Sequence, residues 1–212
     1  MLQAMQDVGK NLAAFVLAGG KSSRMGCDKA LMEFRGRPLI EIAVITARTM
    51  TDDVRIVGNR PDLQMYAPIV IDSYRECGPL GGIEAALRTT DKEWNLILGV
   101  DTPLLPPALL SLLLQHAESS QAQITVPHVE GRYEPLCAIY RRNMLSLVQQ
   151  ALEHKAYRVE GIFQSASLCV LKDQQLAEAG VEAAAFANLN TLEEFAAHAD
   201  GNATKGQRTN AK

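Results

Sequence analysis

Apolar runs of strand length alternate with segments of helical periodicity along most of this chain. The strand-like runs cover residues 13–18, 54–58, 68–71, 94–100, 124–127, 136–140 and 168–171. The helical segments carry apolar residues three and four positions apart, often close to a proline, and cover residues 38–50, 80–89, 106–119 and 141–154. This order predicts an α/β fold of three layers, in which helices cover both faces of a mostly parallel central sheet.

Sheets of this kind bind ligands at the carboxyl ends of their strands, so the residues that follow each strand are the candidates for function. With 212 residues, 47% of them apolar, the chain has the size and composition of one domain with its own core. We expect this domain to cover residues 1–199. The polar segment 200–212 lacks apolar anchors, and we expect it to be disordered.

Charge and cysteine content exclude several classes of function. The formal net charge is −3 with both signs scattered along the chain, which favours neither nucleic acid nor an anionic membrane as a partner. No stretch is long and apolar enough to span a membrane, and the N-terminus does not resemble a signal peptide. The cysteines lie too far apart for a zinc motif, and we expect a cytoplasmic protein with free thiols; they are Cys27, Cys77, Cys137 and Cys169.

The segment LAGGKSSRMGCDK, residues 17–29, follows the first strand-like run. Gly19 and Gly20 let the backbone approach a ligand closely, and Arg24 and Lys29 add two positive charges. A loop of this kind suits a polyanion such as a triphosphate, although it matches neither a Walker loop nor a dinucleotide fingerprint. The alternative is a surface turn with solvated charges.

Asp101 ends the strand-like run before Thr102 and Pro103. A carboxylate there suits Mg²⁺, which usually takes one or two protein carboxylates and completes its shell with phosphate oxygens and water. The alternative is an aspartate that only caps the following turn.

Asp72 repeats the pattern after the run 68–71, where it either contacts a ribose or base or begins a turn. The segment ECGPLGGI follows, with Gly78, Gly81 and Gly82 before a helix. It is either a second loop that approaches a ligand closely or a tight turn without one.

Together these motifs resemble the signature of the molybdenum cofactor guanylyltransferases, which are nucleotidyltransferases of Rossmann-like fold. The segments that carry the resemblance are 17–29, Asp72, 78–82 and 101–103, followed by GRYEPLCAIY and FANLNTLEEF. The resemblance covers roughly residues 13–197. The opening signature alone is shared with cytidylyltransferases and sugar-nucleotide pyrophosphorylases.

The resemblance implies that the chain transfers GMP from GTP to the terminal phosphate of molybdenum-bearing molybdopterin and releases pyrophosphate. It implies a nucleotide site in the N-terminal half, formed by Leu17, Ala18, Gly19, Gly20, Lys29, Asp72 and Asp101. It implies a pterin site formed by the C-terminal half, in the segments around Arg132 to Leu136 and Asn188 to Asn190, with Gly82 near the reacting groups. GTP and molybdopterin are then the small-molecule partners, and molybdoenzymes or other cofactor-biosynthesis proteins the macromolecular ones.

The chemistry needs positioning and charge neutralisation more than a proton transfer, because the attacking phosphate is already an anion. We expect Arg24 and Lys29 to offset the charge of the departing pyrophosphate. Asp101 is the expected ligand of Mg²⁺, which would bridge the nucleotide phosphates.

Two positions depart from the family pattern. Some members have an asparagine where this chain has Val57, and whether Asn59 replaces it is an open question. Leu192 replaces a common proline, while Thr191 and Glu194 keep the spacing of a capping box. In this segment, Asn188 and Asn190 either face the pterin or only shape the turn.

Three other functions remain compatible with the sequence. One is transfer from CTP, one is transfer to a sugar phosphate, and one is a GTP- or pterin-binding module without catalysis. Neither the preferred base nor the oligomeric state follows from physical reasoning on the sequence.

Overall fold

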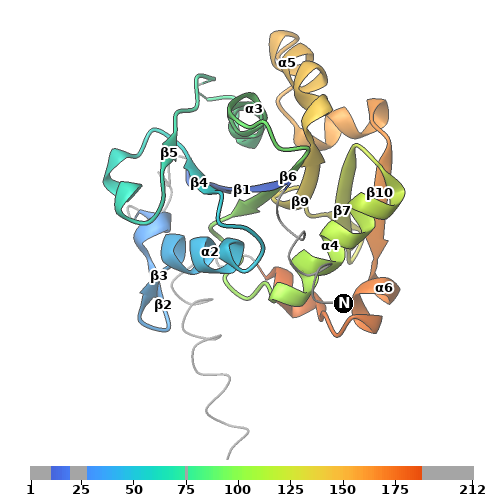
Figure 1. Cartoon of the computed structure of the whole chain (residues 1–212), viewed down its shortest axis with the longest axis horizontal. Coiled ribbons are helices and arrows are strands. Elements are labelled where there is room, and N and C mark those ends of the chain that lie inside the picture. Colours follow the sequence, from blue (N-terminus) through green and yellow to red (C-terminus); the bar gives the residue numbers. More distant parts are fainter. Residues whose placement is uncertain (1–10, 20–27, 75, 188–212) are drawn as a thin grey trace, which may run out of the picture.

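The computed structural model describes residues 11–19, 28–74 and 76–187. Its main sheet runs in the order β10-β7-β9-β6-β1-β4-β5, with β8 paired to β7 (Figure 1). These strands are β1 (Leu12–Leu17), β4 (Val54–Val57), β5 (Ile69–Val70), β6 (Trp94–Gly99), β7 (Ile124–Val129), β8 (Arg132–Tyr133), β9 (Cys137–Arg141) and β10 (Leu168–Lys172). A small separate sheet pairs β2 (Glu33–Phe34) with β3 (Arg37–Pro38).

Most neighbours in the main sheet are parallel, as the sequence predicts. Strands β6, β1, β4 and β5 pair in parallel, and β10 is parallel to β7. Strand β9 runs antiparallel to both β6 and β7, and β8 is antiparallel to β7. The predicted strand-like runs are therefore all strands, and the sheet is mixed but mostly parallel.

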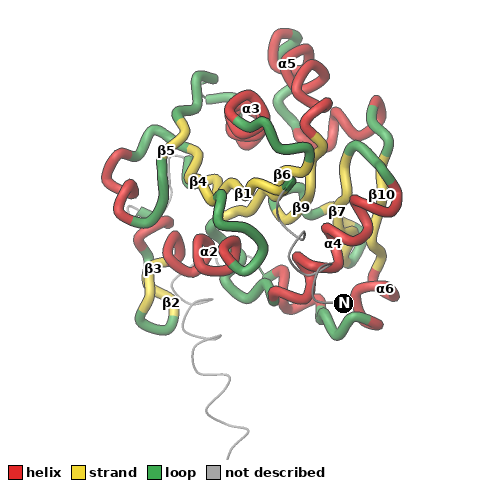
Figure 2. The backbone as a smooth tube through the Cα atoms, viewed as in Figure 1, coloured by secondary structure: helices red, strands yellow, loops and turns green. Residues whose placement is uncertain are grey.

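Helices cover both faces of the sheet, which confirms the predicted three layers (Figures 1 and 2). On one face lie α2 (Leu39–Arg48) and α4 (Pro107–Ser120), and on the other lie α3 (Pro79–Thr89) and α5 (Leu145–Glu153). Strand β1 supplies alternate side chains to the two cores, Leu12, Ala14 and Val16 to the first and Ala13, Phe15 and Leu17 to the second. Its continuous apolar run is the pattern of a strand buried on both faces.

Short helical segments complete the described chain. They are the 3₁₀ helices η1 (Lys29–Leu31), η2 (Pro61–Met65), η3 (Arg142–Met144), η4 (Val159–Ser165) and η5 (Ala183–Phe186), and the short α6 (Asp173–Glu178). In the described part of the chain, none of the helices has the length and apolar character needed to cross a membrane. Among the described residues, Cys77, Cys137 and Cys169 form no disulfide bond, while Cys27 and the segment 200–212 lie outside the described residues.

Candidate active site

The carboxyl ends of four adjacent parallel strands bring the predicted nucleotide residues to one edge of the sheet. Strand β1 ends at Leu17 and is followed by Ala18 and Gly19, and the Ala18 amide donates to the Val57 carbonyl at 3.0 Å. Strands β5 and β6, on either side, lead to Asp72 and Asp101. Residues from three distant parts of the sequence therefore meet where ligands bind to parallel sheets.

Lys29 and Asp101 form an ion pair at this edge, although 72 residues separate them in sequence. Lys29 Nζ lies 3.3 Å from Asp101 Oδ2, and the two side chains are 21% and 28% exposed. Two of the three charges predicted to be catalytic thus occupy one half-buried position that solvent still reaches, and the third, Arg24, lies outside the described residues. An anionic group and a metal ion could each find a partner of opposite charge there.

The backbone before Asp101 leaves room for its carboxylate to fold back. A Cβ atom on Gly99 would stand 2.6 Å from Asp101 Oδ1, so any larger residue would displace that side chain. Among the described residues, Lys29 is the only donor to the Asp101 carboxylate. No hydrogen bond links that carboxylate to the backbone of the next described turn, as the alternative of a simple turn cap would require.

Asp72 does form a turn, and it also contacts the glycine-rich start of helix α3. Its Oδ1 accepts a hydrogen bond from the Tyr74 amide at 2.8 Å. The same oxygen lies 3.1 Å from where a Cβ of Gly81 would stand. The turn role proposed from the sequence is thus present, and a contact between Asp72 and the nucleotide stays a prediction.

Burial raises the pKa of Asp72; the Tyr74 hydrogen bond opposes this rise, and Glu84 adds to it. A raised folded-state pKa stabilises the fold below the unfolded pKa of about 4, and this contribution is lost as pH rises through the folded pKa. Asn in place of Asp72 keeps the acceptor oxygen without the charge. We expect Asp72→Asn to melt up to about 3 °C higher than the wild type at pH 7, with the difference vanishing below pH about 4. Thermal unfolding followed across that pH range tests this, and a lower melting temperature at pH 7 would contradict it.

Gly82, predicted at the pterin, is buried in helix α3, where it packs against β1 and β4. A Cβ there would stand 3.1 Å from Leu17 Cδ2 and 3.7 Å from Val57 Cγ1. Its lack of a side chain therefore lets the helix pack closely on β1 and β4. Gly82 does not line the large cavity described next, and its contact with a substrate stays a prediction.

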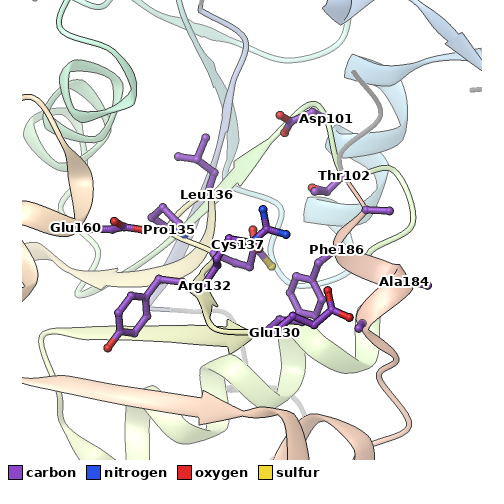
Figure 3. A pocket seen from close by; sticks show the side chains of 15 residues that line it. Asp101, Thr102, Glu130, Arg132, Pro135, Leu136, Cys137, Glu160, Ala184 and Phe186 are labelled. Atoms are coloured by element: carbon purple, nitrogen blue, oxygen red, sulfur yellow. The ribbon is translucent and has the colours of Figure 1, made fainter. Parts of the chain in front are cut away.

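A cavity of about 810 Å³ lies beside Asp101, on the side of the C-terminal half. Figure 3 shows Asp101 and Thr102 at one end of its lining and Glu130 and Phe186 at the other. Arg132, the remaining described residue predicted at the pterin, also lines it. This volume lies within the usual range for sites that enclose small-molecule ligands.

Burial affects two polar side chains that line this cavity, Thr102 and Glu134. Thr102 Oγ1 is buried and has no hydrogen-bond partner among the described residues. Burial raises the pKa of Glu134, Arg132 opposes this shift, and Asp101 reinforces it. Buried polar groups are normally paired, so a bound ligand would supply the partner that the Thr102 hydroxyl lacks.

Thr102 was not predicted as a site residue, although it lies in a quoted motif, whereas Glu134 lies in the segment 132–136 that the resemblance assigns to the pterin. Four predicted site residues lie outside the described part of the chain: Gly20, Arg24, Asn188 and Asn190. Of the remaining predicted residues, Lys29, Asp101 and Arg132 gather around the cavity and the adjoining ion pair, whereas Leu17, Gly82 and Asp72 lie toward helix α3.

The departure at Val57 has a structural explanation. Val57 is 1% exposed and packs within the core formed with α3. Asn59 is exposed, and its amide donates to the Asp72 carbonyl at 3.3 Å. Asn59 therefore lies beside a predicted nucleotide residue, whereas the side chain at position 57 belongs to the core.

A three-layer fold around a mostly parallel sheet, with a glycine-rich segment after β1 and an acidic residue after β6, fits a nucleotidyltransferase of Rossmann-like fold. Residues 14–168 match the MobA-like NTP transferase domain. The chain belongs to this family.

Similar proteins agree with this assignment. A probable molybdenum cofactor guanylyltransferase from Geobacillus sp. is 33% identical, covering 87% of this chain and 96% of its own. Another from Natranaerobius thermophilus is 29% identical, over 87% of this chain and 93% of its own. The crystal structure of molybdopterin-guanine dinucleotide biosynthesis protein A from Archaeoglobus fulgidus has a TM-score of 0.77 at 22% identity, covering 91% of this chain and 99% of that one. At that identity, the structural match supports the fold.

Proposed function

We propose that this chain transfers GMP from GTP to molybdenum-bearing molybdopterin, forming the guanine dinucleotide cofactor and pyrophosphate. The observation that carries the proposal is the Lys29–Asp101 pair between the nucleotide edge of the sheet and the cavity. Relatives named molybdenum cofactor guanylyltransferase, aligned over most of the chain, support the substrate pair.

Mg²⁺ fits the residues present at this position. The described residues contain no cluster of three or more His, Cys, Asp or Glu side chains that could hold a metal alone. A single half-buried carboxylate beside a polar cavity suits a metal that arrives with a nucleotide and takes its other ligands from phosphate and water. Asp101 would hold this ion, which would neutralise phosphate charge and polarise the reacting phosphorus.

Lys29 supplies the protein's own charge to the reaction. Its ammonium lies 3.3 Å from Asp101 Oδ2, at the edge of the sheet where the nucleotide is proposed to bind. In that place it would bind the triphosphate and stabilise the negative charge that builds on the departing pyrophosphate. Arg24, from the same glycine-rich segment, is proposed to act with it.

The cavity is the proposed site of the acceptor. Arg132 offers a forked cation to an anionic group, and Thr102 offers an unpaired hydroxyl. The acceptor phosphate would then attack the α-phosphorus of GTP next to Asp101 without a general base. Residues Asn188 and Asn190 are proposed to complete the pterin contacts.

The cellular setting remains part of the proposal. We propose action in the cytoplasm and delivery of the product to molybdoenzymes or to other cofactor-biosynthesis proteins, because the relatives are named for the molybdenum cofactor.

The acceptor and the metal are tested together. With GTP and Mg²⁺ supplied, we expect the pterin dinucleotide to form from molybdopterin and none to form with sugar 1-phosphates. Chelation by EDTA should stop the reaction, and excess Mg²⁺ should restore it. Transfer to a sugar phosphate instead would replace the proposed acceptor, and GTP binding without any product would indicate a non-catalytic module.

A further inference from the structure

We propose that Arg60 is a positioning residue: it holds Asp28 and thereby orients Lys29 in the nucleotide site. This inference rests on the guanylyl transfer proposed above. Arg60 follows strand β4, at the end of the segment Gly58-Asn59-Arg60.

The Arg60 guanidinium bridges two carboxylates. Its Nη1 donates to Asp28 Oδ1 at 3.0 Å, and its Nη2 lies 2.5 Å from Asp28 Oδ2. On its other side, Nε and Nη2 donate to Asp62 at 2.9 and 2.6 Å. The Arg60 side chain is 24% exposed. Forked, charge-assisted contacts of this kind fix the orientation of both partners.

Each carboxylate has a different place in the chain. Asp62 lies two residues after Arg60, in the first turn of η2 after Pro61, so this local pair sets the direction of the guanidinium. Asp28 lies 32 residues away, directly before η1. The local pair with Asp62 therefore orients the Arg60 guanidinium toward Asp28, which lies in a distant segment of the chain.

Asp28 transmits this contact to Lys29 through the start of η1. Its Oδ1 accepts the Ala30 amide at 3.1 Å, and its carbonyl accepts the Leu31 amide at 3.1 Å. Lys29 is the first residue of this turn, and its ammonium reaches Asp101 at 3.3 Å. A shift of Asp28 would thus move the base of the Lys29 side chain relative to Asp101.

The same short turn also supports the other predicted nucleotide segments. Gly58 has a φ of +153°, and a Cβ on it would stand 3.3 Å from the Gly19 nitrogen, so its backbone packs directly against Gly19. Asn59 donates to the Asp72 carbonyl at 3.3 Å. Residues 58–60 therefore contact the chain at Gly19, Asp28 and Asp72. Exposed ion pairs contribute little to stability, so the Arg60–Asp28 pair serves orientation more than folding.

The test compares Arg60→Gln with the wild type in kcat, in KM for GTP and in melting temperature. We expect kcat to fall about 10-fold, because small displacements of charged groups weaken transition-state stabilisation. The melting temperature should change by less than about 2 °C. Arg60→Lys, which keeps the charge but not the fork, should recover part of kcat. GTP affinity is measured in parallel by calorimetry.

The decisive comparison places Arg60→Gln in a Lys29→Met background. If Arg60 acts through Lys29, adding Arg60→Gln to Lys29→Met lowers neither kcat nor GTP affinity any further. An equal loss in both backgrounds, or wild-type kcat and GTP affinity in Arg60→Gln, would overturn the inference. If the wild type itself makes no pterin dinucleotide, the proposed function fails, and the same comparison of GTP affinities still decides the role of Arg60.

Arg55, which lies on strand β4, provides a matched control. Like Arg60, it forms a forked pair of hydrogen bonds with an aspartate two residues away, in which Nε and Nη2 donate to Asp53 at 2.9 and 3.0 Å. Its side chain is 25% exposed, but it lies near the start of β4, away from the nucleotide edge. Arg55→Gln should keep the wild-type kcat. A loss equal to that of Arg60→Gln would show a general effect of removing such a pair and would count against the inference.

Discussion

Replacing Asp101 with asparagine is expected to lower kcat for GMP transfer by about 100-fold or more, the usual scale for loss of a key electrostatic group. Asparagine matches the size of aspartate but removes the charge that would hold Mg²⁺. It also removes the negative charge that pairs with the Lys29 ammonium. A titration of turnover against Mg²⁺ should show that far more metal is needed, and Mn²⁺ binding in the presence of GTP should weaken in parallel.

Gly99→Ala tests the same carboxylate without removing its charge. The added Cβ would stand 2.6 Å from Asp101 Oδ1, so the side chain must rotate away. We expect a loss in kcat smaller than that of Asp101→Asn, together with weaker Mn²⁺ binding. If Asp101→Asn keeps the wild-type metal requirement, Asp101 does not hold the metal.

Lys29→Met is expected to lower kcat by about 100-fold while KM for GTP rises less. Methionine keeps most of the aliphatic stem and loses the ammonium, so the charge that stabilises the departing pyrophosphate is missing. Folding should change little, because an ion pair between side chains 21% and 28% exposed contributes only modestly to stability. Steady-state kinetics and thermal melting measure the two effects separately.

Lys155→Met is the matched control for this substitution. Lys155 is an exposed lysine that follows helix α5, outside the cavity and away from the Lys29–Asp101 pair. It should retain the kcat of the wild type. Unchanged turnover in Lys29→Met would remove Lys29 from the mechanism, and a large fall in melting temperature would show that its role is structural.

The core strands were predictable because each is a short apolar run buried on both faces, as β1 and β6 are. The direction of β9 was not predictable in this way. Glu130 and Gly131 have φ values of 49° and 82° and form a two-residue turn between β7 and β8. This turn reverses the chain, so β9 returns antiparallel to β7. Glu-Gly is a weak sequence signal for such a turn, since Asn-Gly and Asp-Gly are the usual ones.

The candidate site was predictable where a motif follows a strand directly, as Asp72 and Asp101 do. The side-chain contacts between distant motifs were not predictable. The bridge from Arg60 to Asp28 and the contact of Gly58 with Gly19 depend on how β4 lies beside β1, which spacing in the sequence does not reveal. For the same reason, the cavity formed by the β7–β9 segment and η5 appears only in the folded chain.

The most direct test of the proposed function is turnover with Mg²⁺ and molybdenum-bearing molybdopterin, with GTP, CTP, ATP and UTP offered separately. Pyrophosphate release and formation of the pterin dinucleotide are followed together. We expect both products with GTP alone. Dinucleotide formation with CTP and not with GTP would contradict the guanylyl assignment while leaving the mechanism intact, and no product with any of the four nucleotides would contradict the proposed enzyme activity.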